Sequence, residues 1–257
     1  MPGPPHFLYS IYERRLLRRL DPRALPHHIG IVLDGHRRYA REEGLPSYRD
    51  SYRAGMARFE EFLGWSNELG IPVITGWVLS RENLSRPDEE LEPYFQVLME
   101  LFGRLPTLAA RQNFKLRFIG SLDLLPAELV EKAKAAEAAC AEGQRHLNIA
   151  MGYGGRQEIV DAARDLVTRL AAEGVPAEEM AGKIDADALA RHMYSADLPD
   201  PDLLIRTSGE SRLSGFLLWQ SAYAEFVFVD VYWPAFRRVD FLRALRDYTG
   251  RQRRFGR

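Results

Sequence analysis

Six short runs of β-forming residues alternate with longer amphipathic stretches, and this alternation limits the possible folds of the 257-residue chain more than any other feature. The β-forming runs are 28–33, 73–79, 114–119, 146–151, 203–206 and 226–232. Strands that alternate with helices favour a parallel sheet, because each parallel connection must cross over the sheet. We therefore predict an α/β fold with one central, mostly parallel six-stranded sheet flanked by helices.

The stretches between these runs predict helices over 53–69, 89–112, 126–142, 157–172, 185–194 and 240–254. The second of them is unusually apolar along one side, with Tyr94, Phe95 and Phe102 among its members. Such a stripe indicates either a core helix or the wall of a cavity for a long apolar ligand, and periodicity alone cannot separate the two. No linker and no repeat divides the chain, which favours one domain.

Composition excludes several classes of function. The chain has 35 Lys and Arg against 36 Asp and Glu, so its net charge gives no reason to expect a nucleic-acid partner. Cys140 is the single cysteine, which excludes a disulfide framework and a zinc site built from cysteine pairs. No stretch resembles a signal peptide or is long and apolar enough to span a membrane, so we expect a cytoplasmic protein.

The first chemical motif lies where the run 28–33 ends in Asp34-Gly35 and a helix follows. A residue in this place stands at the carboxyl end of a strand, where ligands bind in open α/β sheets. Arg37 and Arg38 add guanidinium groups that can hold a phosphate with a planar fork. One carboxylate among phosphate-binding groups suits Mg²⁺, which prefers one or two carboxylates together with phosphate oxygens. The alternative is a capping turn with exposed arginines.

Two further polar loops also follow β-forming runs. The loop after 203–206 carries Arg206, Arg212 and several hydroxyl groups, a combination suited to a diphosphate. It leads to Glu225, a carboxylate in an apolar run that needs a metal or arginine partner. The loop 80–87 carries Arg81 and Arg86 after a third run. Together the three loops predict one polyanion site above the carboxyl edge of the sheet.

Several motifs in order resemble those of the cis-prenyltransferases, the undecaprenyl diphosphate synthase family. They are the Asp-Gly-x-x-Arg turn at 34–38, the Ser-x-Glu-Asn-x-x-Arg-Pro loop at 80–87, Gly-Tyr-Gly-Gly-Arg at 152–156, and Arg-Thr-x-Gly-Glu-x-Arg-x-Ser at 206–214 running into Leu-Trp-Gln-x-Ala-Tyr-x-Glu at 218–225. The chain is most similar to the branch that makes short-chain Z-farnesyl diphosphate. The resemblance extends from residue 25 to 257, after a basic amphipathic segment at 1–24, and it implies a hydrophobic tunnel enclosed by the fold.

The resemblance also implies residue roles. Asp34 would hold Mg²⁺ and help the allylic diphosphate to ionise, and Glu225 would be a second metal contact. Asn83 matches the residue assigned to proton removal or substrate orientation, and orientation is the better reading because a neutral amide is a poor base. The remaining positions that would bind substrate are Gly35, His36, Arg37, Arg38, Tyr39, Ser80, Arg81, Glu82, Leu84, Arg86, Arg206, Arg212, Leu213 and Ser214.

The implied reaction condenses isopentenyl diphosphate with geranyl or farnesyl diphosphate to give a Z-configured polyprenyl diphosphate. Trp77 and Val78 would add bulk to the wall of the tunnel and stop growth early, which favours a short- to medium-chain product. The chain departs from the family pattern at His36, where an asparagine is usual, and at Ser211, where a histidine is common. The His36 exchange keeps a head-to-middle, lavandulyl-type synthase open as an alternative. A non-catalytic partner subunit is a second alternative, although Asp34 and both loop arginines are retained.

Both ends of the chain are basic. Arg14, Arg15, Arg18 and Arg19 alternate with leucines, and eight arginines lie between 237 and 257. These ends could be solvated helix faces, could lie on the inner face of the plasma membrane, or could reach the diphosphate site of a partner subunit. The family resemblance implies a homodimer.

Overall fold

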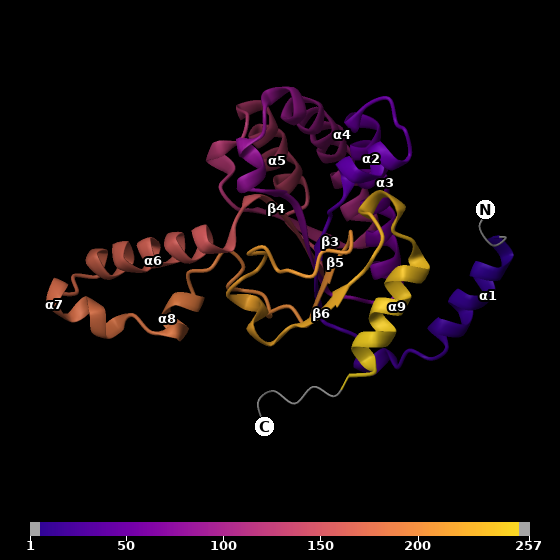
Figure 1. The fold of residues 1–257 in the computed structure, drawn as a ribbon. Helices are drawn as coiled ribbons and strands as arrows, with labels where there is room; N and C mark the ends of the chain where they lie inside the picture. The colour runs from indigo at the N-terminus through magenta and orange to yellow at the C-terminus, as the bar shows by residue number, and fades with distance from the viewer. Residues whose placement is uncertain (1–5, 252–257) are drawn as a thin grey trace.

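A single six-stranded sheet forms the centre of the molecule, in a computed structural model that describes residues 6–251 (Figure 1). Its strands are β1 (His28–Val32), β2 (Val73–Ser80), β3 (Phe114–Ile119), β4 (Arg145–Tyr153), β5 (Leu203–Arg206) and β6 (Glu225–Phe228), in the order β3-β4-β2-β1-β5-β6. All five pairings between these strands are parallel. The predicted fold class is confirmed.

The helices follow the alternation seen in the sequence. They are α1 (His6–Leu17), α2 (His36–Glu42), α3 (Tyr48–Glu68), α4 (Asp88–Gln112), α5 (Ala127–Ala139), α6 (Gly155–Ala172), α7 (Ala177–Met180), α8 (Ala186–Ala190) and α9 (Arg238–Thr249). The strongly periodic α3, α4 and α6 agree with prediction to within a few residues at each end, whereas the predicted helix at 185–194 is shortened to α8.

The last predicted strand is shorter than expected, because the chain leaves the ladder after Phe228. The Val229 amide donates to the Arg206 carbonyl at 2.8 Å, and the Trp233 amide donates to the Asp34 carbonyl at 2.9 Å. Residues 229–231 stay beside the loop after β5, where the Ser208 and Gly209 amides donate to the Val231 and Val229 carbonyls, and Trp233 reaches the end of β1. This arrangement brings a second segment of the chain against the first chemical motif.

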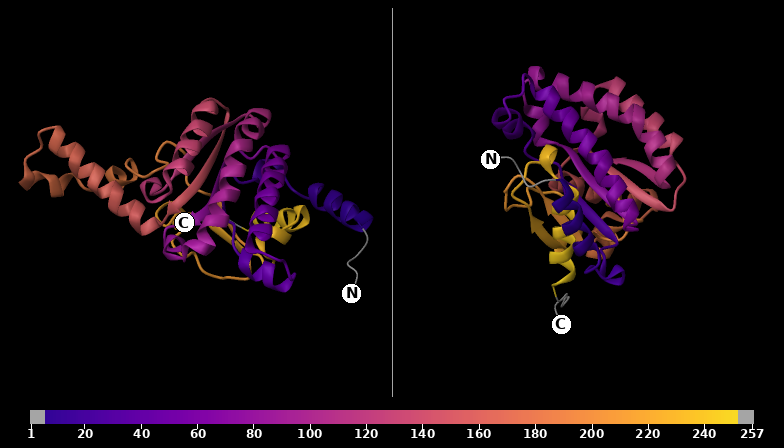
Figure 2. Two further views of the ribbon diagram at one scale, coloured as in Figure 1. Left: turned by 90° about the horizontal axis from the view of Figure 1, so that it is seen from above. Right: turned by 90° about the vertical axis from the view of Figure 1, so that its right-hand side faces the viewer.

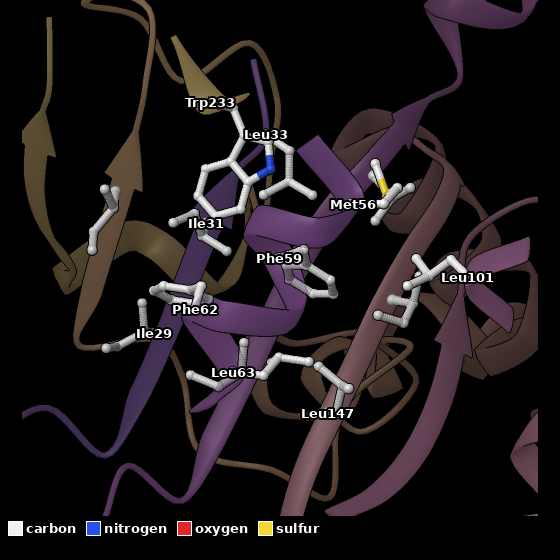
Figure 3. Close-up of a cluster of buried hydrophobic side chains, with 14 of the residues drawn as sticks. Ile29, Ile31, Leu33, Met56, Phe59, Phe62, Leu63, Leu101, Leu147 and Trp233 are labelled. Atoms are coloured by element: carbon white, nitrogen blue, oxygen red, sulfur yellow. The ribbon is translucent and has the colours of Figure 1, made fainter. Parts of the chain in front are cut away.

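Two hydrophobic clusters fill the two faces of the sheet. The larger cluster joins one face to α3, α4, α5 and α9, and Figure 3 shows Phe59 and Phe62 of α3 beside Ile29 and Ile31 of β1. The smaller cluster covers the other face and includes Trp77, Phe216 and Leu217. Helices thus cover mainly one face, whereas part of the segment 207–224 covers the other. The packed first face makes the carboxyl edge a rigid support for loops.

Two parts of the chain lie outside this central body. Helices α6, α7 and α8 form an arm that projects from the sheet, as Figure 1 and the left view of Figure 2 show. Helix α1 packs against α9, where the Arg237 side chain donates to the Tyr9 hydroxyl at 2.8 Å. Within residues 6–251, no helix is long and apolar enough to cross a membrane.

Candidate active site

A cavity of about 660 Å³ opens at the carboxyl edge of the sheet, where the loops after β1, β2 and β5 meet. The three polar loops predicted from the sequence are therefore brought together. The cavity is lined by Val32, Leu33, Asp34, Gly35, His36, Arg37, Arg38, Arg41, Tyr52, Trp77, Val78, Ser80, Glu82, Asn83, Arg86, Tyr94, Arg206, Glu210, Arg212 and Ser214. Six arginines and three carboxylates in this lining make it a site for a polyanion.

Asp34 stands at the centre of the polar lining, two residues after β1 ends. Its Oδ1 accepts a hydrogen bond from the Gly35 amide at 2.7 Å, and its Oδ2 accepts one from Arg206 Nη2 at 3.0 Å. Gly35 has φ +100°, and a Cβ there would come within 2.6 Å of the Tyr232 ring. The glycine thus permits the turn that aims Asp34 into the cavity, with its side chain 36% exposed.

Arg206 connects Asp34 to the second polar loop. It ends β5, its side chain is only 8% exposed, and its Nη1 donates to Ser214 Oγ at 2.7 Å and to the carbonyl of Arg212. A buried guanidinium held by one carboxylate and two neutral acceptors is fixed in orientation. The structure thus brings the predicted Asp34, Arg206 and Ser214 into one hydrogen-bonded group.

Three of the other arginines that line the cavity are paired with carboxylates. Arg37 contacts Glu90 at 2.9 Å. Glu210 bridges two cations, with Arg38 at 3.2 Å and Arg212 in closer contact. These pairs are partly exposed, so each stabilises the fold only slightly and can be exchanged for a phosphate.

The loop after β2 supplies the third side of the polar lining. Ser80 Oγ accepts a hydrogen bond from the backbone amide of Asn83 at 3.1 Å. The side-chain oxygen of Asn83, Oδ1, accepts one from Arg86 Nη2 at 2.6 Å. Because arginine can only donate, this contact fixes the Asn83 side chain with its carbonyl oxygen occupied. The group that Asn83 can offer a ligand is its NH₂, a hydrogen-bond donor.

His36 lies between the polar and apolar parts of the cavity. Its Nδ1 is 3.2 Å from the Ser51 carbonyl, and burial lowers its pKa to about 4, so the ring is neutral at pH 7. Its Nε2 is buried without a hydrogen-bond partner among the described residues. A Cβ on Gly55 would come within 2.0 Å of the ring, so a glycine in α3 makes room for the imidazole.

Several residues expected to bind substrate lie outside the cavity lining. They are Tyr39, Arg81, Leu84 and Leu213. The Arg81 side chain instead donates to Ser121 Oγ at 2.8 Å, while Leu84 and Leu213 pack against the hydrophobic clusters. Their direct contact with substrate stays a prediction, whereas Gly35, His36, Arg37, Arg38, Ser80, Glu82 and Arg86 do line the cavity.

Glu225 is placed at the opposite edge of the sheet from Asp34. Glu225 begins β6 and pairs with Leu203 of β5, which lies three residues before Arg206. At about 3.3 Å per residue, Glu225 and the level of Arg206 are roughly 10 Å apart along the strands. Its carboxylate accepts from Arg251 Nη1 at 2.7 Å. The sequence left a metal or an arginine open as the partner of Glu225, and in the structure the partner is an arginine. Glu225 does not lie beside Asp34 within one chain.

Glu210 and Tyr94 line the cavity but were not among the predicted site residues. Glu210 stands in the Arg-Thr-x-Gly-Glu motif, so its neighbourhood was visible in the sequence, although its pairing with Arg38 was not. Tyr94 belongs to the apolar stripe of α4, whose pattern is the same for core and cavity residues. Only the tertiary structure shows that Tyr94 lines the cavity, whereas the apolar residues that follow it in α4 do not.

Trp77 and Val78 of β2 pack in different hydrophobic clusters. Val78 belongs to the cluster shared with α3 and α4, whereas Trp77 stacks on Phe216 in the other cluster, with ring centroids 5.1 Å apart. Both line the cavity. The two residues therefore contribute to the cavity wall from different sides of the sheet.

A protein-only metal site is not present among residues 6–251, where no group of three or more His, Cys, Asp or Glu side chains could hold an ion. A single carboxylate beside many phosphate-binding groups instead fits a divalent cation that arrives with its phosphate ligands. Asp34, whose side chain is 36% exposed at the cavity, is the residue placed to contact such a cation.

Comparison with known proteins decides the family. Residues 32–256 match the sequence model of the undecaprenyl diphosphate synthases, a prenyltransferase family. The chain belongs to this family. It is 52% identical over 250 residues to a (2Z,6E)-farnesyl diphosphate synthase of Thermobifida fusca, an alignment that covers 97% of each chain. The cis-prenyltransferase assignment and its fold are therefore confirmed.

Solved structures of the family have the same fold. Lavandulyl diphosphate synthase from Lavandula x intermedia, in complex with dimethylallyl diphosphate, superposes with a TM-score of 0.85 at 31% identity, covering 91% of this chain and all of that one. An undecaprenyl diphosphate synthase homologue of Campylobacter jejuni superposes with a TM-score of 0.73 at 26% identity, covering 90% of this chain and 99% of that one. The central body is thus shared by cis-prenyltransferases from a plant and from bacteria.

Proposed function

We propose that this cis-prenyltransferase condenses isopentenyl diphosphate with a short allylic diphosphate, geranyl or farnesyl, to give a short- to medium-chain Z-polyprenyl diphosphate. The observation that carries the proposal is the cavity itself, in which an arginine-rich mouth leads to an apolar end lined by Leu33, Val78 and Tyr94. A ligand with a polyanionic head and an apolar tail matches this polarity. The similarity to a (2Z,6E)-farnesyl diphosphate synthase supports the short product.

The reaction breaks the carbon–oxygen bond of the allylic diphosphate and joins the allylic carbon to the terminal alkene carbon of isopentenyl diphosphate. Pyrophosphate leaves, and the new tertiary cation loses one proton from the adjacent carbon. Arg37 and Arg38 lie after β1 and suit the allylic diphosphate, whereas Arg206, Arg212 and Ser214 suit the diphosphate of isopentenyl diphosphate. Fixed guanidinium groups stabilise the negative charge that accumulates on the departing pyrophosphate.

Asn83 acts in this proposal by orientation. Its carbonyl oxygen is held by Arg86, so its NH₂ can donate to a diphosphate oxygen near the reacting carbons. A neutral amide is too weak a base to remove this proton. The departing pyrophosphate is a stronger base, and we assign proton removal to it.

The cofactor in this proposal is Mg²⁺, held by Asp34 together with phosphate oxygens. When bound, it supplies Lewis-acid stabilisation of the leaving diphosphate. Asp34 is restrained by the Gly35 amide, so its free lone pairs are held toward the arginine-rich mouth.

The direct test incubates the purified protein with labelled isopentenyl diphosphate, geranyl or farnesyl diphosphate, and Mg²⁺, then sizes the extracted lipid. We expect a labelled Z-prenyl diphosphate of few isoprene units that requires both substrates and the metal. Absence of labelled lipid with either primer would refute the condensation. A product beyond about ten isoprene units would refute the short-chain part of the proposal.

A head-to-middle synthase is the second candidate, favoured by the superposition on lavandulyl diphosphate synthase and by the unusual His36. That reaction joins two allylic units, so dimethylallyl diphosphate alone would suffice as substrate. Product formed from dimethylallyl diphosphate without isopentenyl diphosphate would favour this candidate over chain elongation.

We also propose that the protein forms a homodimer through the arm and the β6 edge. Val160 and Val167 on α6 are 43% and 40% exposed, and Phe228 on the edge strand is 41% exposed. Large apolar side chains on a projecting arm and an unpaired sheet edge are typical of an interface. A second copy of the chain is the partner that the family resemblance implies.

We propose a cytoplasmic location, where both diphosphate substrates are water-soluble. The face available for a membrane is smaller than the sequence suggested, because Leu16 and Leu20 are buried rather than turned outward. Ile11, 48% exposed, remains as an apolar residue on the outer side of α1. The proposal therefore includes no membrane contact, and residues 252–257 of the basic end lie outside the described structure.

A further inference from the structure

A tyrosine outside the cavity lining packs against Arg38, one of the arginines inside it. The guanidinium carbon of Arg38, Cζ, lies over the Tyr232 ring at 5.5 Å from its centroid, a separation at which a cation is attracted to an aromatic face. The same ring lies against Gly35, where an added Cβ would come within 2.6 Å of Tyr232 Cδ1. Tyr232 therefore contacts both the glycine turn and the arginine that follows it, without lining the cavity itself.

The backbone on both sides of Tyr232 is fixed by its neighbours. Before it, the Val231 carbonyl accepts a hydrogen bond from the Ser208 amide at 2.8 Å, and after it, the Trp233 amide donates to the Asp34 carbonyl at 2.9 Å. Trp233 has no exposed surface and belongs to the large hydrophobic cluster shown in Figure 3. Because these contacts do not involve the Tyr232 side chain, a substitution at position 232 should leave the backbone in place.

The Tyr232 hydroxyl binds a carboxylate that stands close to Arg38 in the sequence. It donates to Glu42 Oε1 at 2.5 Å. Glu42 follows Arg38 by four residues in α2, and side chains at this spacing are neighbours on the surface of a helix. Within residues 6–251, however, the carboxylate paired with Arg38 is that of Glu210, at 3.2 Å, and not that of Glu42. The hydrogen bond to Glu42 raises the pKa of Tyr232, so the hydroxyl keeps its proton and remains a donor.

We infer that Tyr232 is a positioning residue for the allylic diphosphate: its ring supports Arg38, and its hydroxyl holds the Glu42 carboxylate away from that guanidinium. The inference rests on the proposed function, which assigns Arg38 to the allylic diphosphate. A second carboxylate beside Arg38 would weaken the attraction between this arginine and a phosphate, because their charges add at short range. Tyr232 thus favours substrate binding by keeping a competing negative charge at a distance.

The test is a double-variant cycle at positions 232 and 42. Each protein is titrated calorimetrically with an unreactive thiodiphosphate analogue of geranyl diphosphate. We expect Tyr232→Phe to bind it about threefold more weakly than wild type, because phenylalanine keeps the ring but frees Glu42 to pair with Arg38. Glu42→Gln should bind within about twofold of wild type, and Tyr232→Phe combined with Glu42→Gln should bind as Glu42→Gln does. Tyr232→Leu also removes the ring, so we expect about tenfold weaker binding.

A second titration separates positioning from a general loss of structure. Isopentenyl diphosphate is titrated into each protein saturated with the geranyl analogue, and Tyr232→Phe should bind it as wild type does, because Arg206 and Arg212 lie on another loop. The matched control is Tyr12→Phe. Arg243 lies over the Tyr12 ring with its Cζ 5.2 Å from the centroid, and neither residue lines the cavity, so both affinities should stay unchanged.

The outcomes distinguish this inference from the proposed reaction, because neither titration requires turnover. Unchanged affinity for the geranyl analogue in Tyr232→Phe, weaker binding of isopentenyl diphosphate, or no recovery in the double variant would each overturn the inference, even if the enzyme makes a prenyl product. Recovery in the double variant of a protein that makes no prenyl product would support the inference and refute the proposed condensation.

Discussion

Asp34 is the residue on which the chemistry depends most, because it is the carboxylate at the centre of the arginine-rich lining. We predict that Asp34→Ala lowers turnover by a factor of about 10² to 10³, the usual cost of removing one electrostatic contact to a developing charge. Arg206 would retain its contacts with Ser214 and the Arg212 carbonyl, so the fold should survive. Turnover and circular dichroism on the same preparation check both parts. Activity within a few-fold of wild type would remove Asp34 from the mechanism.

Glu210 competes with the substrate for two arginines. It neutralises Arg38 and Arg212 in the absence of ligand, and a diphosphate must replace its carboxylate at both. We predict that Glu210→Gln binds inorganic pyrophosphate several-fold more tightly, because the amide leaves both guanidinium groups without a charge partner. Calorimetric titration measures this, with Glu60→Gln as the control, since Glu60 pairs with Arg104 on the outer surface. Weaker binding in Glu210→Gln would mean that the carboxylate positions the arginines instead.

At the residue scale, the sequence predicted most of the side chains that line the cavity, but neither how they pair nor that Glu225 lies away from Asp34. Asp34, Arg206 and Ser214 follow strands, and the parallel sheet brings strand ends to one edge. The contact of Glu210 with Arg38 joins residues 172 positions apart, and no local pattern encodes it. Tyr94 was seen only as part of an apolar stripe, because a cavity wall and a core have the same periodicity.

At the scale of elements, the strongly periodic segments were predicted well and the chain near the site was not. Strands β3 and β5 have the bounds expected from sequence, whereas β6 ends at Phe228, four residues early. The run 229–232 is as β-forming as a strand, but beyond Phe228 it pairs with the irregular segment at Ser208 and Gly209, and Trp233 then donates to the Asp34 carbonyl. Tertiary hydrogen bonding thus overrides local propensity where the chain crosses the cavity mouth.

The arm and the β6 edge of the sheet predict a homodimer. We expect wild type to elute with twice the mass of one chain in size-exclusion chromatography with light scattering. Phe228→Asp places a charge on the exposed edge, and we predict a shift to the mass of one chain, since a buried unpaired charge opposes association. Leu124→Asp is the control, because Leu124 is similarly exposed, at 46%, but lies after β3 at the other side of the sheet. A monomeric wild type, or a dimeric Phe228→Asp, would contradict the proposed interface.

For the whole molecule, the near-zero net charge conceals a strong local separation. Six of the 31 arginines line one cavity at the carboxyl edge, and the packed layer of α3, α4 and α9 holds that edge in place. The molecule therefore combines a cationic pocket with a net negative remainder, and such a pocket selects a small polyanion rather than an extended one.

The stability of this body should depend on pH through His28, which connects three parts of it. Its Nε2 lies 2.8 Å from Thr75 Oγ1 on the neighbouring strand, and its Nδ1 lies 2.7 Å from the Pro199 carbonyl. Burial lowers the pKa of His28 to about 4, against about 6.5 in the unfolded chain. Between these values only the unfolded state takes up the proton, so the free energy of unfolding falls as pH falls through this window. The contribution is complete above pH 6.5 and amounts to about 3 kcal/mol lost by pH 4.

Urea unfolding at pH 7, 6, 5 and 4 measures this dependence. We predict that His28→Gln has a lower free energy of unfolding than wild type at pH 7, because the amide cannot reproduce both contacts. Its slope against pH between 6.5 and 4 should be flatter by about one proton, or about 1.4 kcal/mol per pH unit where the difference is largest. His27→Gln is the matched control, because it makes the same exchange at the adjacent, exposed histidine. Equal slopes in wild type and His28→Gln would show that His28 is charged in the folded protein and that other groups govern its sensitivity to acid.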